Sequence, residues 1–350
     1  MQNHSEPSPR LSSLLQSALD RHDQGALTEA ESLYQEVLEL DSLHFIAMHG
    51  LGVLKTQRGA FVAAVQILEA ALRINPRSAL AHANLGLALW HLNRPEEALI
   101  HYQYSLRIDP GNPDVLLNSA VVLRDLGQYE GALESLDKLL ALLPDSPEGY
   151  MNRGIVLKDL RRLEEALVSL GLACSLNPQL ADAHWAHGDV LRALKRPDEA
   201  MESYRVAFAL EPKYAADAFV NYGNALCEAG RLEEGLESYK NALVINPDHA
   251  EAAMYRGEVL LELNRPLEAL TNIDFSLTLR PGHAGALLNR GIVLLELGRF
   301  AEAQAAFEIA LTFPNEPGGR VLSLRKKAEL LARHEHALAT KLYQLRRQPS

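Results

Sequence analysis

The chain has 350 residues, and 34 Lys and Arg against 45 Asp and Glu give a net charge of −11. Such an acidic chain gains no general attraction to phosphate backbones, which disfavours broad nucleic-acid binding, and 47% hydrophobic residues exclude wholesale disorder. Two cysteines, Cys174 and Cys227, cannot form a disulfide framework. With no signal-peptide pattern and no apolar run near the ~18 residues of a membrane span, we expect a cytoplasmic protein without membrane insertion.

In chain order, residues 1–10 are expected to form a disordered N-terminus, and a repeat of 34 residues follows over 11–317. One extra residue near Ala215 interrupts the spacing. Because the repeats occupy nearly the whole chain, they predict one elongated helical solenoid rather than two domains. The nine repeats begin at Leu11, Phe45, Ala79, Pro113, Pro147, Ala181, Ala216, Ala250 and Ala284.

Each repeat is predicted to contain two helices, because both halves carry apolar residues at helical spacing. Pro95, for example, falls where a second helix starts, and Pro76 falls where one ends. A turn residue separates the two halves at one fixed place. These residues are Gly59, Asn93, Gly127, Arg161, Lys195, Gly230, Asn264 and Gly298.

Two positions of the repeat are always small, the eighth (as in Gly86 and Gly154) and the twentieth (as in Ala98 and Ala166). A glycine inside a helix costs about 1 kcal/mol relative to alanine, so its recurrence needs a packing reason. We expect the two helices of a repeat to touch at these positions. A large residue at position 24, such as Tyr102, would fill the adjacent gap.

The 34-residue period, the small residues at positions 8 and 20, the large residue at 24 and the proline at 32 resemble the tetratricopeptide repeat (TPR) family. The resemblance implies an all-α fold, a right-handed α-α superhelical solenoid of nine helix-turn-helix repeats. First helices would line a concave groove, and second helices would form the convex side. The family's Trp at position 4 is rarely present in this chain.

Positions 2, 6, 9 and 13 of the first helix form one stripe, which we expect to be the exposed surface of the groove. Position 6 is asparagine in five repeats, although asparagine is a poor residue for a helix interior. An amide that both donates and accepts can pair with the backbone of an extended peptide. The plain alternative is that asparagine belongs to the repeat consensus. The candidate peptide-binding residues are Asn84, Asn118, Asn152, Asn221 and Asn289.

The other stripe positions change from apolar to acidic along the chain. Ile46 and Leu80 are apolar in repeats 2 and 3, whereas repeats 6 to 8 carry acids at position 2, which a helix N-terminus favours in any case. We therefore expect a peptide ligand with an apolar part and a basic part. The acids at positions 9 and 13 of these repeats add further candidate contacts with the basic part. These are Asp189, Glu228, Glu258 and Glu262.

Residues 318–350 carry eight Lys and Arg against two Glu, and their apolar residues follow helical spacing. They are predicted to form a basic amphipathic capping helix and tail, since a solenoid needs a polar cover on its last repeat. Three other roles stay open: a homodimer through 320–345, docking of a partner, and occupation of the protein's own acidic groove.

Searches for catalytic chemistry find nothing specific. His184 and His187 lie three residues apart without an evident third ligand, and neither cysteine has a predictable histidine partner. We expect no cofactor, no metal and no enzyme activity. The sequence favours a non-enzymatic protein-interaction scaffold that binds an extended peptide. The alternatives are a substrate-recruiting arm acting in trans for an enzyme such as a glycosyltransferase, and an assembly factor that uses its convex face and ends.

Overall fold

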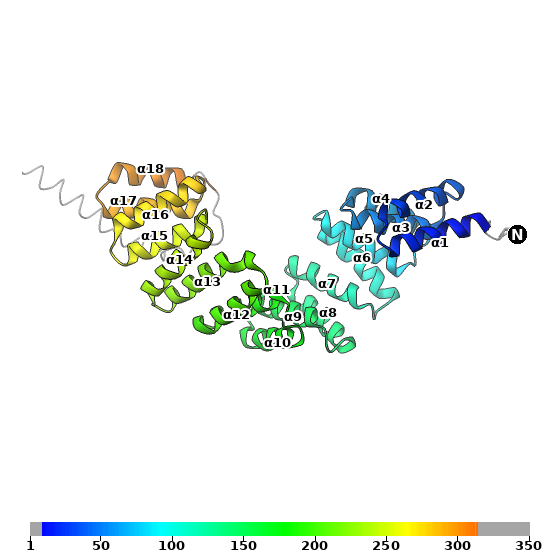
Figure 1. Cartoon of the computed structure of the whole chain (residues 1–350), viewed down its shortest axis with the longest axis horizontal. Helices are drawn as coiled ribbons and strands as arrows, with labels where there is room; N and C mark the ends of the chain where they lie inside the picture. The colour runs from blue at the N-terminus through cyan, green and yellow to red at the C-terminus, as the bar shows by residue number, and fades with distance from the viewer. Residues whose placement is uncertain (1–8, 312, 314–350) are drawn as a thin grey trace, which may run out of the picture. The chain divides into compact units, whose positions relative to one another are not determined.

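A computed structural model describes residues 9–311 and residue 313, and these residues form eighteen α-helices and one short 3-10 helix without a strand (Figure 1). The all-α class is therefore confirmed. Residues 1–8 of the expected disordered N-terminus lie outside the described residues. The same holds for the expected capping helix at 318–350.

The helices follow one another in packed pairs, and their contacts group the chain into an N-terminal unit up to Asn177 and a C-terminal unit from Pro178. The first helices of the pairs are α1 (Pro9–Asp23), α3 (Phe45–Gln57), α5 (Ala79–His91), α7 (Pro113–Asp125), α9 (Pro147–Asp159), α11 (Ala181–Ala193), α13 (Ala215–Glu228), α15 (Ala250–Glu262) and α17 (Ala284–Glu296). The second helices are α2 (Leu27–Leu40), α4 (Phe61–Ile74), α6 (Pro95–Ile108), α8 (Tyr129–Leu142), α10 (Leu163–Leu176), α12 (Pro197–Leu210), α14 (Leu232–Ile245), α16 (Pro266–Leu279) and α18 (Phe300–Leu311).

Two helix starts differ slightly from the sequence expectation. Helix α1 begins at Pro9, so Pro9 and Arg10 are helical rather than part of a disordered terminus; proline suits a first helical position because its missing N–H has no partner to lose there. Helix α13 begins at Ala215, one residue early. The inserted residue is accommodated by the 3-10 helix Pro212–Tyr214, which directly precedes α13.

The turn inside each repeat is made by a residue in the left-handed region. At the end of α5, Asn93 has φ of 58°, and the N–H of Arg94 donates to the carbonyl of Leu89 at 3.0 Å. This backbone pattern satisfies carbonyls that the helix end leaves open. All eight turn residues predicted from the repeat have positive φ, four of them glycine and four of them Asn, Arg or Lys.

The two helices of a repeat touch at the small positions, as predicted. A Cβ added at Gly86 would lie 2.7 Å from Tyr102 Cε1, and one added at Gly154 would lie 2.5 Å from Leu170 Cγ. Both distances are shorter than real Cβ contacts, so a methyl group at either glycine would force the facing side chain to shift. Ala98, at position 20, is likewise fully buried. The glycines therefore set the close approach of the paired helices.

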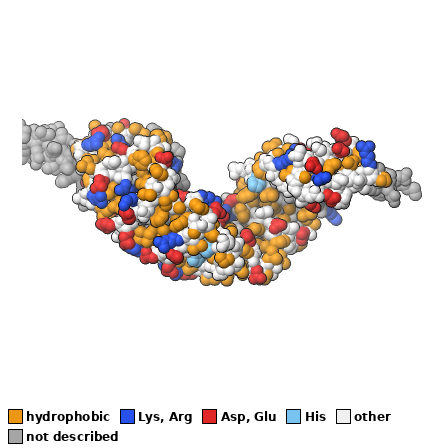
Figure 2. Space-filling model, in the orientation of Figure 1, with side chains coloured by type: hydrophobic (Ala, Val, Ile, Leu, Met, Phe, Trp, Pro, Cys, Tyr) orange, Lys and Arg blue, Asp and Glu red, His pale blue; other side chains and the backbone are white. Residues whose placement is uncertain are grey.

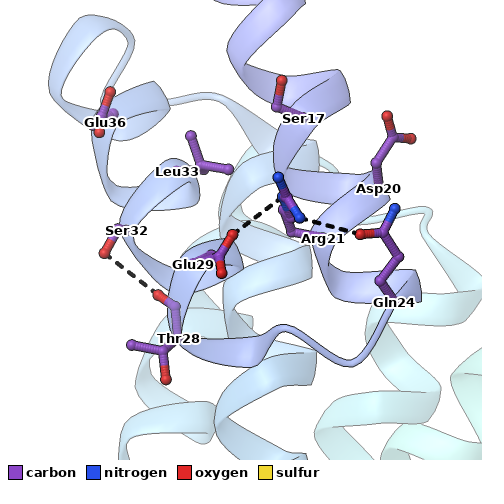
Figure 3. A pocket seen from close by; sticks show the side chains of 9 residues that line it. All are labelled: Ser17, Asp20, Arg21, Gln24, Thr28, Glu29, Ser32, Leu33 and Glu36. Atoms are coloured by element: carbon purple, nitrogen blue, oxygen red, sulfur yellow. Dashed lines mark hydrogen bonds and ion pairs between the residues drawn. The ribbon is translucent and has the colours of Figure 1, made fainter.

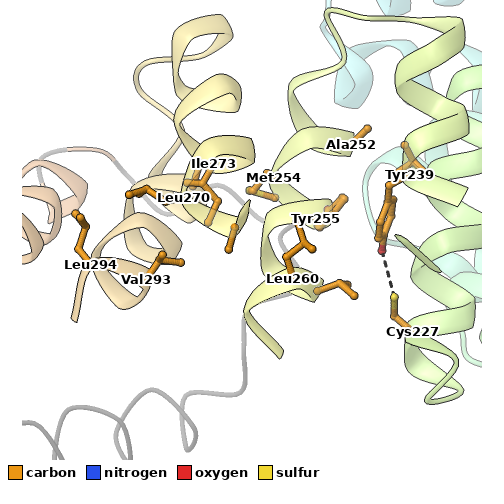
Figure 4. Close-up of a cluster of buried hydrophobic side chains, with 14 of the residues drawn as sticks. Cys227, Tyr239, Ala252, Met254, Tyr255, Leu260, Leu270, Ile273, Val293 and Leu294 are labelled. Atoms are coloured by element: carbon orange, nitrogen blue, oxygen red, sulfur yellow. Dashed lines mark hydrogen bonds between the residues drawn. The ribbon is translucent and has the colours of Figure 1, made fainter. Parts of the chain in front are cut away.

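The core of the C-terminal unit runs through successive helix pairs (Figure 4). Tyr239 and Ile273 are fully buried in it, and Val293 and Leu294 extend it into α17. The hydroxyl of Tyr239 lies 3.8 Å from the sulfur of Cys227, which is also buried. The thiol thus serves the packing of this core.

Candidate functional site

A hollow of 300 Å³ lies between the first helices α5 and α7 of the N-terminal unit. Leu80, Asn84 and Leu87 line it from α5, and Asp114 and Asn118 line it from α7. Figure 2 shows hydrophobic and charged side chains mixed over the visible surface, so an exposed apolar residue alone marks no site. Here the amides of Asn84 and Asn118 border an apolar floor of Leu80 and Leu87, beside the Asn112 amide and the Asp114 carboxylate. The structure thus brings together two of the predicted asparagines.

The amide of Asn84 is held by a histidine of the preceding repeat. Asn84 Nδ2 lies 3.0 Å from His49 Nε2, and the His49 ring stacks on Phe45 with ring centroids 5.9 Å apart. Burial lowers the pKa of His49, an effect partly offset by a backbone hydrogen bond to Leu80. The imidazole is therefore neutral at pH 7 and accepts from Asn84. This bond engages the amide nitrogen of Asn84 and leaves its carbonyl oxygen as an acceptor.

Asn152 on α9 is held in a similar way by its own helix. Its Nδ2 donates to the carbonyl of Glu148 at 2.9 Å. One amide hydrogen of Asn152 is therefore engaged within the helix, which leaves the second amide hydrogen and the carbonyl oxygen for other contacts. Asn84, Asn118 and Asn152 occupy corresponding positions on α5, α7 and α9, although Asn152 does not line the hollow.

The remaining two predicted asparagines lie in the C-terminal unit. Asn221 is half-buried on α13. Asn289 on α17 is only 3% exposed, and its Oδ1 has no hydrogen-bond partner. The expectation that Asn289 faces an open groove is therefore wrong. Helical spacing showed which residues share a face, but it could not show what covers that face.

The acids at position 2 of the C-terminal unit are engaged by residues near the end of their own repeats. The hydroxyl of Tyr214 donates to Asp182, His249 Nε2 lies 3.0 Å from Asp217 Oδ1, and a guanidinium nitrogen of Arg280 lies 3.2 Å from Glu251. Each contact joins the start of a first helix to the segment that follows the second helix of the same repeat. These carboxylates serve as links within the unit, which reduces what they offer to a basic ligand.

The four acids that carried the basic-ligand prediction have different surroundings. Asp189 accepts the Tyr204 hydroxyl at 2.8 Å; burial, followed by the charge of Asp189, raises the pKa of Tyr204. Glu228 is exposed and Glu262 is half-buried. Glu258 is only 1% exposed, so its expected place on an open surface is wrong, for the same reason as that of Asn289. Glu228 and Glu262 remain the candidates for contact with a basic segment.

The groups that could support catalysis or metal binding have ordinary partners. Burial raises the pKa of the Cys174 thiol to about 11, so it is not a thiolate at neutral pH. His184 Nε2 lies 3.2 Å from the carbonyl of Pro178, and His187 Nδ1 lies 2.9 Å from the hydroxyl of Ser203. Within residues 9–311 and 313, no group of three or more His, Cys, Asp or Glu is placed to hold a metal ion.

A larger hollow, of 650 Å³, lies between α1 and α2 (Figure 3). Arg21 reaches across it, with Nε 3.2 Å from Glu29 and a second guanidinium nitrogen 3.3 Å from Gln24. Its lining is mostly polar, and the Arg21 guanidinium is already engaged by Glu29 and Gln24.

None of the described helices is both long and apolar enough to cross a membrane.

These helix pairs, small contact positions and turn residues define a scaffold of repeated helix pairs. Family models described as tetratricopeptide repeat or TPR repeat match residues 15–79, 63–113, 89–153, 147–180, 181–214, 223–264 and 265–319. The chain therefore belongs to the tetratricopeptide repeat family, whose members are protein-interaction scaffolds.

Solved structures of TPR proteins are similar to this chain. A TPR protein from Parabacteroides merdae shares 20% identity with a TM-score of 0.54, over 74% of this chain and 98% of its own. PilF of Pseudomonas aeruginosa shares 22% identity with a TM-score of 0.51, over 61% and 97%. YrrB, described as a TPR protein with an unusual peptide-binding site, shares 24% identity with a TM-score of 0.46, over 57% and 99%. No curated protein sequence matches.

Proposed function

We propose that the protein is a non-enzymatic scaffold that binds an extended peptide segment of a partner along α5, α7 and α9. The observation that carries this proposal is the hollow where Asn84 and Asn118 border Leu80 and Leu87. The apolar floor would take a hydrophobic side chain, and the amides would pair with the peptide backbone on either side of it.

The exposed apolar side chains on this face support a ligand with an apolar part. Leu80 is 59% exposed and Ile46, at the corresponding position of α3, is 47% exposed. A peptide that covers both would remove apolar surface from water, while the asparagines fix its direction and register. A basic part of the ligand would contact Glu228 and Glu262 of the C-terminal unit.

The test is an array of extended peptides of varied apolar and basic content, probed with the wild type and with a triple variant, Asn84→Ala, Asn118→Ala and Asn152→Ala. Alanine is the better helix former, which offsets the loss of the Asn84–His49 hydrogen bond, so the variant should still fold. We expect it to lose binding to peptides that the wild type retains. Gln66→Ala with Gln103→Ala, on the second helices α4 and α6, is the matched control.

Undiminished array binding by the triple variant would overturn the groove proposal and favour an assembly factor that uses other surfaces. The acidic contribution is tested separately with Glu228→Gln and Glu262→Gln. If these carboxylates contact a basic segment, their loss should weaken binding of Lys- and Arg-rich peptides at low salt, and the difference should shrink at high salt.

A further inference from the structure

The outward side of helix α6 carries a ridge of exposed apolar side chains in the N-terminal unit. Ile100, Tyr104 and Ile108 are 50%, 43% and 44% exposed, and they follow one another at four-residue spacing. Such spacing places them along one side of the helix. We call this surface the α6 face and define it by Glu96, Ile100, Tyr104, Arg107 and Ile108.

The α6 face is held in place by a stack of rings. The rings of His82 and Tyr104 lie nearly parallel with centroids 5.2 Å apart, and the Arg107 guanidinium lies 4.4 Å from the centre of the Tyr104 ring. His82 is itself fixed, because its Nδ1 lies 3.0 Å from His101 Nδ1. An exposed ring that is already ordered loses little entropy when a partner covers it.

A hollow of 470 Å³ adjoins the ridge on the side of α4. Its walls include Leu72, Pro76, Leu85 and the Tyr104 ring. A ridge next to a hollow is the surface relief that lets two helices interdigitate. A second helix with a similar ridge could therefore place a side chain into this hollow.

The charges on the α6 face indicate which helix that would be. Glu96 lies in the first turn of α6 and Arg107 in the last, and both are exposed. Their sequence separation places them on the same side as Ile100. In an antiparallel pair of two α6 helices, Glu96 of each copy would lie beside Arg107 of the other, with the apolar ridges between them.

We infer that the α6 face binds a second copy of this chain, with the two α6 helices antiparallel about a two-fold axis. The face matches itself in both shape and charge, as a two-fold interface requires. One helix face is small for an interface, which predicts a weak dimer with a Kd of roughly 10–100 μM.

Helix α10 provides a matched comparison within the same unit. Val168, Leu172 and Leu176 form an equally exposed ridge there, and Glu164 corresponds to Glu96. The position of Arg107, however, is occupied by Ser175. Helix α10 thus has the apolar ridge without the charge pattern that would pair it with itself.

The test is sedimentation equilibrium of the full chain from ~1 to ~500 μM, a range that brackets the expected Kd. Glu96→Arg and Arg107→Glu should each weaken the dimer about tenfold, because each places like charges together twice across the two-fold axis. The double variant reverses both charges and should restore wild-type association. Glu164→Arg is the control and should leave association unchanged.

Four results would overturn the proposal. These are a wild type that stays monomeric up to ~500 μM, single variants that associate like the wild type, a double variant that stays as weak as the singles, and a Glu164→Arg variant that is weakened equally. A thermal melt of each variant checks that the charge changes leave the fold intact. Rescue by the double variant also distinguishes self-association from docking of an unrelated protein. An unrelated partner would carry no matching charge reversal, so its binding would stay weak.

Discussion

At the scale of the residue, the glycine at position 8 is required because the large side chain that faces it leaves little room for a Cβ. We predict that Gly154→Ala destabilises the protein by about 1–3 kcal/mol, because the added methyl would meet the Leu170 side chain in a well-packed contact. Urea unfolding measures the change. Gly154→Ala combined with Leu170→Ala should lose less stability than the sum of the two single variants, since the smaller side chain makes room for the methyl.

Gly171 on α10 is the matched control for this prediction. It is also a glycine inside a helix, but a Cβ added there would meet nothing within 4 Å. Gly171→Ala should therefore stabilise the protein by about 0.5–1 kcal/mol through helix propensity alone. Equal effects of the two substitutions would show that backbone entropy, rather than packing, explains the glycine at position 8.

His49 gives the protein a pH dependence at the same scale. Burial lowers its pKa in the folded state, so between that pKa and the unfolded value of ~6.5 the unfolded chain binds more protons. Stability should therefore rise with pH through this window and level off above ~6.5. His49→Gln keeps an acceptor for Asn84 without titrating.

Thermal midpoints of the wild type and of His49→Gln between pH 5 and pH 8 measure this effect. We expect the wild type to lose more stability than the variant as the pH falls, because protonation removes the Nε2 acceptor of Asn84. The exposed Gln66 provides a control substitution, Gln66→Ala, which removes no titratable group, so its pH profile should follow the wild type. Parallel curves for the wild type and His49→Gln would contradict the attribution of this pH dependence to His49.

At the scale of the element, four turns place a residue other than glycine in the left-handed region. Arg161 has φ of 61° and Lys195 has φ of 60°, a conformation that costs such residues about 1–2 kcal/mol. We predict that Arg161→Gly and Lys195→Gly each raise the free energy of unfolding by about 0.5–1 kcal/mol, after allowance for the greater freedom of glycine when unfolded.

Asn93 provides the comparison for these turns, because it has the same conformation, with φ of 58°, and asparagine tolerates it better. Asn93→Gly should therefore give a smaller gain in urea unfolding than Arg161→Gly. A gain at Asn93 equal to or larger than that at Arg161 would mean that backbone strain is not what distinguishes these turns.

The elements also show why the sequence predicts the fold better than the site. A turn at Asn93 or a contact between Gly86 and Tyr102 depends on residues of one repeat, so the 34-residue period reveals it. The environment of Asn84 depends on His49 in the preceding repeat, and no pattern within a single helix indicates that bond. Glu258 and Asn289 fit the stripe equally well, yet they are buried. Helical periodicity fixes which residues share a face, but it does not show whether that face is open.

At the scale of the whole molecule, contacts are local in sequence. Among the described helices of each unit, a helix contacts the next one, and a first helix also contacts, more sparsely, the first helix of the next repeat, as α7 contacts α8 and α9. The free energy of unfolding of such a chain is close to the sum of the intrinsic stability of each repeat and the interaction between neighbouring repeats. Different repeats can therefore open separately. A local change should therefore have a local effect on opening.

This locality leads to a prediction for Gly154→Ala measured by hydrogen exchange. The strained contact lies between α9 and α10, so amides there and in the adjoining α8 should exchange faster than in the wild type. Amides of α15 to α17, several repeats away, should keep their wild-type rates. Gly171→Ala serves again as the control and should slow exchange in α10, if it has any effect. Uniformly faster exchange along the whole chain would instead show that the repeats unfold as one cooperative body, and the description of stability as a sum of neighbour terms would fail.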